Sequence, residues 1–495
     1  MKRPRLDADA AGALADLWPR YDRTKLKTGI VHLGVGAFHR AHQAVYTDGV
    51  LARDPRWGII GASLRAPDTR DALRPQQGLY ALSLRDGTGE RLRVIGSLRE
   101  VLVAPESPQG LVAAMAVPDV RIVSLTVTEK GYCHDPATGR LREDHPDVQH
   151  DLAHPAAPRS ALGFILAALR VRRAAGLAPF SVLCCDNLPA NGRTVHQVLQ
   201  DLAALQGGDM ARFIANEVAC PATMVDRIVP ATTDEDRARI AGKLGFEDAW
   251  PVVSEPFSQW VIEDHFSAGR PDWASEGAEF VRDVAPFELA KLRLLNGAHS
   301  SLAYLGYLSG DETVADAMAR PAMVRFVAHL MEHEVSPTLT AAQGPDLASY
   351  RSALQARFAN PALRHRTWQI AMDGSQKLPQ RLLGTIRDRL AAQAPIPALA
   401  LGIAAWMAYV TGIDQQGRAI DVRDPLRDEL RARADAAGRD AAKLAPSLAS
   451  VTAIFGPELP QDSRFMGPVT TALEQILNHG APAALSWFLA CQAQA

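Results

Sequence analysis

A short apolar strand, Ile30-Val31-His32-Leu33, leads directly into Gly34-Val35-Gly36 and then into a helical stretch that reaches about Leu51. In dinucleotide-binding units the first glycine of such a turn permits a tight bend, and the second lets the backbone approach a pyrophosphate. The helix that follows offers unpaired N–H groups to the phosphates. A complete G-x-G-x-x-G pattern would need glycine at position 39, where this chain has His39. The spacing therefore fits both a nucleotide site and an ordinary strand-to-helix turn.

Strands and helices alternate through the first half of the chain. Further strands are predicted at residues 58–63, 79–84, 91–95, 121–127 and 180–184, with a long helix at 160–173. Continuous apolar strands between helices predict an α/β fold with a mostly parallel sheet that is covered on both faces. From about residue 286 only helical patterns remain, at 286–308, 313–334, 363–372, 378–392 and 398–409. We therefore expect a nucleotide-binding domain at 1–285 and a mostly helical domain at 286–495.

The composition excludes several classes of protein. A chain of 495 residues is too long for one ordinary core, and 47% apolar with 22% charged residues describes a globular protein. A formal net charge of −2 gives no reason to expect nucleic acid or an anionic membrane as a partner. A charged N-terminus and the lack of a long apolar run predict a cytoplasmic protein without a membrane span.

Several segments together resemble one family. Residues 34–43 read GVGAFHRAHQ, which is similar to the opening motif of the polyol-specific long-chain dehydrogenases, the mannitol dehydrogenase family. The resemblance continues in order to about residue 420, through TVTEKGY (126–132), CDNLP (185–189), TMVDRIVP (223–230), EPFSQWV (255–261) and KLRLLNGAH (291–299). It implies a Rossmann-type N-terminal domain, a helical C-terminal domain, and metal-independent, NAD-linked oxidation of a secondary alcohol.

The resemblance also implies a set of cofactor-binding residues. They are Gly34, Gly36, Phe38, His39 and Arg40 in the opening motif, and Asp226 on the cofactor side of the site. Asp226 could instead form a salt bridge with a neighbouring arginine.

The choice between NAD and NADP depends on residues that follow the second strand. Asp68 lies where a carboxylate could bind the ribose hydroxyls and repel a 2′-phosphate, although it could also be an ordinary surface aspartate. NAD is therefore the predicted cofactor, while Arg65 and Arg70 nearby leave NADP possible.

The chemistry is expected on the helix that begins near Pro286. At about 100° per residue, Lys291, His299 and Asn296 fall near 0°, 80° and 140° around its axis and can converge on one pocket. A lysine buried beside a positively charged nicotinamide loses its proton more readily than a free lysine. We expect Lys291 to be the general base in oxidation and the general acid in reduction.

Two asparagines and a histidine complete the expected catalytic group. Asn296 and Asn187 can donate amide hydrogen bonds to a developing alkoxide, and His299 can hold substrate hydroxyls or orient Lys291. The resemblance gives the same positions as the family's catalytic lysine, its two asparagines and its substrate-binding histidine. Without the resemblance, Lys, Asn and His on one helix face are typical of a solvated surface, although the surrounding leucines indicate that the helix is buried.

The expected substrate is a sugar acid. Residues 365–379, HRTWQIAMDGSQKLP, resemble the fructuronate reductase (D-mannonate oxidoreductase) subgroup. Mannitol dehydrogenases place arginine where this chain has Gln369 and tend to have glycine where it has Lys130. Lys377 resembles the family's second substrate-binding lysine. Our hypothesis is that Lys130, Arg366 or Lys377 binds a substrate carboxylate.

Three functions remain open at this point. The first is NAD-dependent interconversion of D-fructuronate and D-mannonate, and the second is the same chemistry on D-mannitol and D-fructose. The third is a non-catalytic regulator that binds a nucleotide or a sugar. No metal site is predicted, because the pairs His150/His154 and His329/His333 lack an obvious third ligand. A monomer or small oligomer is expected by analogy with the family.

Overall fold

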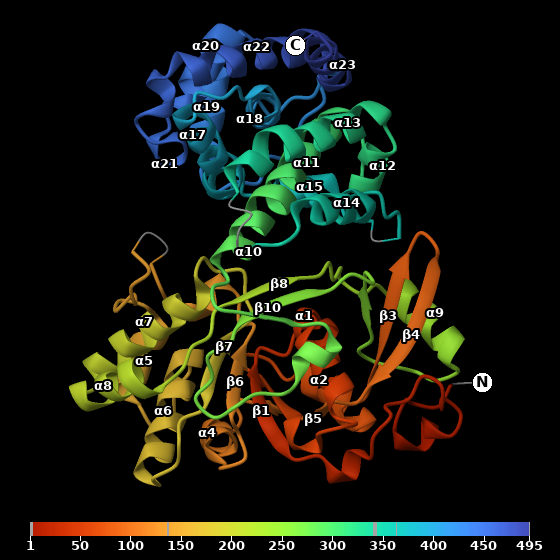
Figure 1. Ribbon diagram of the computed structural model, residues 1–495, viewed down its shortest axis with the longest axis vertical. Helices are drawn as coiled ribbons and strands as arrows, with labels where there is room; N and C mark the ends of the chain where they lie inside the picture. Colours follow the sequence, from red (N-terminus) through yellow and green to blue (C-terminus); the bar gives the residue numbers. More distant parts are fainter. Residues whose placement is uncertain (1–2, 136–137, 340–343, 363, 495) are drawn as a thin grey trace. The chain divides into compact units, whose positions relative to one another are not determined.

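The computed structural model describes residues 3–135, 138–339, 344–362 and 364–494. The chain divides into two compact units, Met1–Ala285 and Pro286–Ala495. Figure 1 colours the chain from red at the N-terminus to blue at the C-terminus, and each unit is described by itself.

A parallel sheet forms the centre of the N-terminal unit. Its five strands in the described residues lie in the order β5-β2-β1-β6-β7. They are β1 (Thr28–Leu33), β2 (Gly58–Ser63), β5 (Leu98–Val103), β6 (Ile122–Leu125) and β7 (Ser181–Cys184). The chain runs outward from β1 to β2 and β5, and then returns to add β6 and β7 on the other side of β1. The strand order therefore reverses between β1 and β6, which is where open α/β sheets bind ligands.

Helices and loops cover both faces of this sheet, as the apolar strands require. Val31 and Leu33 pack into one core, together with side chains of α4, α6, α7 and α8. Ile30 belongs to a separate core on the opposite face, together with side chains of α1 and α2. The helices of this unit are α1 (Ala37–Ala41), α2 (Gln43–Val50), α3 (Asp68–Leu73), α4 (Pro108–Ala116), α5 (Pro146–Ala153), α6 (Ala161–Ala174), α7 (Asn191–Leu205), α8 (Gly208–Glu217) and α9 (Asp234–Leu244).

Two smaller sheets lie beside the parallel one. The predicted hairpin is confirmed as β3 (Tyr80–Asp86) and β4 (Gly89–Ile95), which pair antiparallel, and β9 (Val252–Ser254) joins β3 in parallel. The other sheet has the order β11-β10-β8, and its strands are β8 (Thr223–Asp226), β10 (Gln259–Glu263) and β11 (Glu279–Val281). The strands β5, β8, β9, β10 and β11 were not among those expected from the sequence.

The described part of the C-terminal unit is built from helices around α18 (Pro397–Val410). Residues 398–410 of α18 are all buried, as expected for a helix that is apolar on every side. The other α-helices are α10 (Ala285–Ala290), α11 (Ala298–Leu308), α12 (Val314–Met318), α13 (Pro321–His329), α14 (Leu347–Phe358), α15 (Thr367–Ala371), α16 (Gly374–Leu378), α17 (Gly384–Ala391), α19 (Arg427–Ala437), α20 (Ala441–Ala449), α21 (Thr452–Phe455), α22 (Ser463–His479) and α23 (Ala481–Gln492).

In the described residues of this unit, three π-helical segments interrupt the helices, at Lys291–Gly297, Leu330–Val335 and Pro379–Leu383. The predicted helix at 313–334 is in fact broken between α12 and α13, because Pro321 starts a new helix at its first position. The predicted helix at 363–372 shrinks to α15, and its first residue, Leu363, lies outside the described residues. The predicted fold class, a Rossmann-type domain followed by a mostly helical domain, is confirmed.

Candidate active site

The glycine turn after β1 can only be built with glycine at its first position. Gly34 has φ = +94°, and a Cβ atom on it would lie 2.1 Å from the carbonyl oxygen of Thr126. Gly36 is exposed and precedes the first residue of α1. The turn therefore presents bare backbone at the carboxyl end of the sheet, which is the surface that a pyrophosphate needs.

A buried polar cluster supports this turn from below. His32 is fully buried on β1, and its Nδ1 lies 2.8 Å from Ser124 Oγ on β6. Its Nε2 lies 2.9 Å from Thr126 Oγ1, and Ser124 Oγ donates to Gln43 Oε1 at 2.8 Å. Burial lowers the pKa of His32 to about 3, so the ring is neutral at ordinary pH. The cluster links β1, β6 and α2 at the point where the strand order reverses.

The other residues of the opening motif mostly point into the unit. His39 is fully buried and its ring stacks on His32 at 3.5 Å. The Arg40 guanidinium donates to Trp250 O and lies 5.2 Å from the centre of the Tyr80 ring. Phe38 is half-buried and stacks on the His42 ring at 4.9 Å. The side chains of His39 and Arg40 thus support the first helical turn from inside the unit.

Asp68 follows the carboxyl end of β2 by five residues. It is exposed at the first position of α3. Arg70, in the same helix, is paired with Asp71 and Glu106. Its charge is therefore already compensated within this unit.

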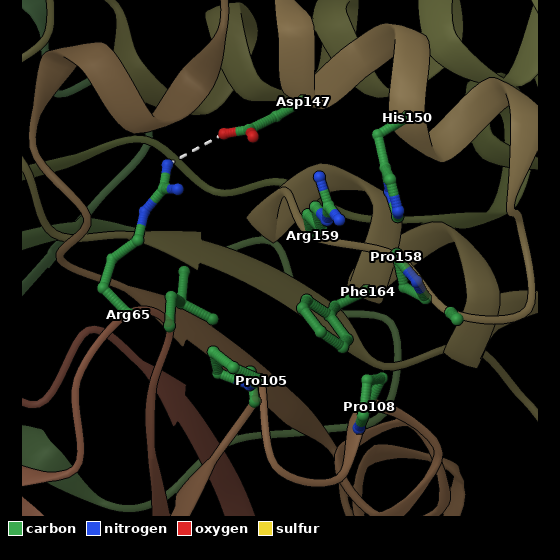
Figure 2. A pocket seen from close by; sticks show the side chains of 11 residues that line it. Arg65, Pro105, Pro108, Asp147, His150, Pro158, Arg159 and Phe164 are labelled. Carbon is green, nitrogen blue, oxygen red and sulfur yellow. Dashed lines mark hydrogen bonds and ion pairs between the residues drawn. The ribbon is translucent and has the colours of Figure 1, made fainter.

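A cavity of about 550 Å³ opens at the carboxyl ends of β2 and β5. Figure 2 shows Phe164 and the prolines Pro105, Pro108 and Pro158 lining it, with Arg65 and Asp147 joined by an ion pair. Arg65 Nη2 and Asp147 Oδ2 are 2.8 Å apart, so this arginine, three residues before Asp68 in the sequence, is held by a carboxylate. The volume falls in the range of small-molecule sites, and apolar walls with a few polar groups are typical of them.

The loops after β6 and β7 carry Lys130 and Asn187, and one carboxylate ties them together. Asp186 Oδ2 accepts hydrogen bonds from Val127 N at 2.8 Å, Thr128 N at 3.2 Å and the Tyr132 hydroxyl at 2.7 Å. Burial raises the pKa of Asp186, while these three donors lower it. Lys130 and Asn187 are themselves exposed, on loops that follow neighbouring parallel strands.

Asn191 joins the end of β7 to the sheet that carries Asp226. Its Nδ2 donates to Thr223 O at 2.8 Å and to Asp186 O at 3.1 Å, and its Oδ1 accepts from Thr223 N at 2.9 Å. Asp226 is buried at the end of β8, where it pairs with Gln259 of β10.

In the C-terminal unit, Lys291 begins the π-helical segment Lys291–Gly297, which continues directly from α10 into α11. Lys291 is 9% exposed and His299 8%, while Asn296 is half-buried. Hydrogen bonds in a π-helix join residues five apart, so Lys291 and Asn296 lie one turn from each other. This corrects the angle of about 140° expected for an α-helix and brings the two side chains toward the same face.

His299 is surrounded by aromatic and cationic side chains. Its ring stacks on Phe358 of α14 at 5.0 Å and meets the His365 ring edge-on at 4.8 Å. Burial, followed by the electrostatic influence of His365 and of the positive Arg381, Arg357 and Lys377, holds the pKa of His299 well below its ordinary value. Among the described residues, His299 Nε2 has no hydrogen-bond partner. The ring is therefore neutral and offers an unused polar atom in a positive environment.

The expected substrate-binding residues occupy different surroundings. Lys377 is half-buried in α16, and its Nζ donates to Met372 O at 2.6 Å and Ile370 O at 3.4 Å. Arg366 and Gln369 are both exposed, the first as the N-cap of α15 and the second within it.

The two histidine pairs do not gather further ligands in the described part of the chain. The His150 and His154 rings stack at 4.7 Å, and the His329 and His333 rings lie 4.8 Å apart. No group of three or more His, Cys, Asp and Glu side chains suited to a metal ion occurs among the described residues. Nor is any described helix both long and apolar enough to cross a bilayer.

Known proteins match both units. Residues 28–275 match the mannitol dehydrogenase Rossmann domain, and residues 283–477 match the mannitol dehydrogenase C-terminal domain. This chain belongs to the mannitol dehydrogenase family. The expectation of an oxidoreductase of this family is thereby confirmed.

Relatives in the mannitol dehydrogenase family include enzymes with two different names. The D-mannonate oxidoreductase of Escherichia coli (strain K12) is 48% identical over 470 residues, covering 94% of this chain and 96% of that protein. A mannitol 2-dehydrogenase of Aspergillus fumigatus (strain CBS 144.89 / FGSC A1163 / CEA10) is 42% identical over 483 residues, covering 96% and 95%. The mannitol 2-dehydrogenase of Pseudomonas fluorescens, solved as a ternary complex with NAD and D-mannitol, is 38% identical with a TM-score of 0.86, covering 98% and 99%.

Several residues near the candidate residues of each unit could not be found from the sequence. Asp186 and Asn191 stand beside Asn187 in the sequence, but their roles depend on partners 32 to 59 residues away. Arg357 and Arg381 were not considered either, because arginines in helices are typically surface residues. Only the folded chain shows that both act on His299.

Proposed function

We propose that this protein is an NAD-dependent oxidoreductase that interconverts D-fructuronate and D-mannonate, with Lys291 as the general acid and base. The observation that carries this proposal is the buried Lys291 in a π-helical segment that also holds Asn296 and leads to His299. π-Helical segments occur frequently at functional sites. The identity of 48% to a D-mannonate oxidoreductase supports the substrate.

The N-terminal unit fits NAD by its own geometry. The bare backbone at Gly34 and Gly36 suits the pyrophosphate, and the exposed Asp68 suits the ribose hydroxyls. The cavity beside Arg65 and Asp147 is large enough for the adenine end. NAD would accept a hydride from the substrate alcohol during oxidation and NADH would return it during reduction.

The protein's own residues move the proton and stabilise the oxygen. In oxidation Lys291 takes the hydroxyl proton, and in reduction it returns a proton to the same oxygen. Asn296 donates a hydrogen bond to that oxygen, and Asn187 is a second amide donor; losing one such donor typically raises the barrier by about 3 kcal/mol. His299, which is neutral, binds a neighbouring substrate hydroxyl through Nε2, an atom that has no hydrogen-bond partner among the described residues.

A second candidate is the interconversion of D-mannitol and D-fructose. It is favoured by the mannitol 2-dehydrogenase of Pseudomonas fluorescens, whose structure is similar over almost the whole chain. The two candidates share the proposed lysine chemistry and differ only in whether the substrate carries a carboxylate.

The experiment that separates them is NADH oxidation by the purified protein at neutral pH, without added metal, on D-fructuronate and D-fructose in parallel. We expect kcat/KM to be at least about 100-fold higher for fructuronate, a preference of about 2.7 kcal/mol in the transition state. A preference for fructose would support the second candidate. Inactivity on both would contradict the two proposals together.

A further inference from the structure

Thr128, in the loop after β6, has a backbone conformation that is nearly reserved for glycine. Its φ is 64° and its ψ is 163°, a region in which the side chain of an L-residue crowds its own backbone. Among the described non-glycine residues with positive φ, Thr128 is the only β-branched one. Such a conformation costs energy and persists only where the surroundings hold it, and strained residues of this kind gather at functional sites. Neighbouring groups must therefore hold Thr128 in place.

Hydrogen bonds hold the peptide groups on both sides of the Thr128 Cα atom. On one side, Asp186 Oδ2 accepts from Thr128 N at 3.2 Å and from Val127 N at 2.8 Å. On the other side, Thr128 O accepts from Gly131 N at 2.9 Å. Gly131 also packs closely on Val127, because a Cβ atom at position 131 would lie 2.8 Å from Val127 Cγ2. Of these partners, Asp186 alone comes from a different loop, the one that follows β7.

Asp186 is itself held in position by several contacts. Its Oδ2 also accepts from the hydroxyl of the buried Tyr132 at 2.7 Å. Its backbone carbonyl accepts from Asn191 Nδ2 at 3.1 Å, and Asn191 is the first residue of α7. The preceding residue, Cys185, donates its backbone N–H to Leu125 O of β6 at 2.9 Å. The carboxylate that holds Thr128 is therefore fixed to both the parallel sheet and α7.

The two loops that Asp186 joins carry two of the expected site residues. Lys130 lies two residues after Thr128, and Asn187 directly follows Asp186. Both are exposed at the carboxyl end of the parallel sheet, where open α/β sheets bind ligands. We propose that Asp186 is a positioning residue: by holding Thr128 in its strained conformation, it fixes both loops before a substrate binds. This inference rests on the proposed function, in which Asn187 donates a hydrogen bond to the reacting oxygen.

The first test measures kcat of the full-length protein on D-fructuronate and D-fructose, at saturating substrate and NADH. Asp186→Asn should lower kcat by about 10- to 100-fold, because a small displacement of a catalytic group is enough for such a loss. Adding Thr128→Gly should then raise kcat by about fivefold or more, since glycine adopts this conformation without strain. Adding Thr128→Ala should not raise it, because alanine keeps the Cβ atom.

Hydrogen exchange followed by mass spectrometry is a second readout, which needs no turnover. In Asp186→Asn, the backbone amides of residues 127–133 and of residues 185–190 should both exchange at least about tenfold faster. Tyr132→Phe removes a single hydrogen bond to the same carboxylate oxygen, so it should fold and show a smaller change in both loops.

Asp48→Asn is the matched control. Asp48 is also a buried carboxylate, and it accepts from the Tyr21 hydroxyl at 2.5 Å, from Gly96 N at 2.8 Å and from Arg93 at 2.6 Å. None of these donors belongs to a residue with positive φ. The control variant should be less stable than the wild type, with kcat and the exchange of both loops unchanged.

Three results would overturn the positioning role of Asp186. They are faster exchange in only one of the two loops, an unchanged kcat in Asp186→Asn, and recovery of kcat by Thr128→Ala as well as by Thr128→Gly. Inactivity of the wild type on both substrates would instead contradict the proposed function. The exchange rates would then still decide whether Asp186 holds the two loops together.

Discussion

His32 in the N-terminal unit and His299 in the C-terminal unit stand in opposite surroundings. In the N-terminal unit, both ring nitrogens of His32 have partners, which are hydroxyl groups and a backbone carbonyl. In the C-terminal unit, His299 has a free Nε2 among the described residues, and its charged neighbours raise the local positive potential. Both rings are neutral because both are buried.

This difference distinguishes a histidine that holds the backbone in place from one that can bind a ligand. A satisfied neutral network holds backbone in place, and it costs stability to disturb because each polar group would lose its partner. An unsatisfied polar atom in a charged environment also costs stability, and a bound substrate is one way to offset that cost. We therefore infer that His32 and its hydrogen-bond partners shape the glycine turn, whereas His299 and the side chains around it bind the substrate.

The largest expected effect is on the rate, from Lys291→Met. The substitution removes the ammonium and keeps much of the buried side chain, so kcat on fructuronate should fall about 1,000-fold with little change in the unfolding midpoint. Lys443→Met, at an exposed lysine paired with Asp440, is the control and should keep the wild-type rate. A Lys291→Met variant with more than a tenth of the wild-type kcat would refute the assignment of the proton to this residue.

The next effect is on stability at low pH, and it tests whether the buried histidines of both units stay neutral in the folded protein. Burial lowers the pKa of His32 to about 3 and, with the charge of Lys377, that of His365 to about 4. Below pH 6.5 these two histidines bind protons in the unfolded chain but stay neutral in the folded protein. The free energy of unfolding therefore falls as the pH falls. Urea unfolding at pH 7 and pH 5 should show a loss of about 2 kcal/mol for each histidine.

The variants His32→Phe and His365→Phe should each remove about 2 kcal/mol of this pH dependence. A variant that leaves the pH dependence unchanged would show that the histidine in question is protonated in the folded protein.

The sharpest comparison is between His32→Phe and His299→Phe. Phe at 32 keeps the stack on His39 but removes the contacts to Ser124 and Thr126, so the free energy of unfolding should fall by about 1–3 kcal/mol. Phe at 299 keeps the stack on Phe358, so stability should hold while kcat/KM for fructuronate falls about tenfold. Unfolding curves measure the stability of each variant, and initial rates measure its kcat/KM. If His32→Phe lowered the rate and His299→Phe lowered the stability, the supporting and substrate-binding roles of the two histidines would be reversed.

The smallest effect concerns the cofactor. Asp147→Asn would release Arg65, whose side chain is 75% exposed, from its ion pair at the cavity. An arginine near Asp68 that is no longer paired can bind a 2′-phosphate, so kcat/KM for NADPH should rise about fivefold while NADH use stays constant. Asp144→Asn breaks a comparable pair with Arg142 away from the cavity and should change neither value. If both variants gave the same kcat/KM for NADPH, the cavity would not be part of the cofactor site.

The fold could be predicted where the pattern of apolar residues is local. The strands around Ile30 and residues 58–63 are continuous apolar runs, and the loss of such runs after residue 285 marks the helical unit. The short strands β8 and β10 could not be predicted, because four or five residues give little periodicity and their pairing joins distant segments. The π-helical segments were missed because the assumption of 100° per residue has no place for them.

The part of the candidate site that lies within a single sequence motif could be predicted. Lys291, Asn296 and His299 stand within nine residues of one another, so their shared helix follows from the sequence. Arg357 and Arg381 lie more than fifty residues further on, and only packing against Ser300 and Phe358 brings them to His299. The roles of the predicted site residues stay predictions until the variants are measured.

The π-helical segment Lys291–Gly297 makes the number of residues in this helix as important as their identity. Such a segment fits one residue more into a turn than an α-helix does. Deleting one residue between Lys291 and Asn296 would let the helix relax to α geometry, with α11 still packed in the core. The lost residue and the lost wide turn would offset each other, so Lys291 would keep its direction relative to His299. Inserting one residue there would instead turn Lys291 by about 100° relative to His299, so a single-codon insertion would leave a folded protein whose proposed acid–base group points elsewhere.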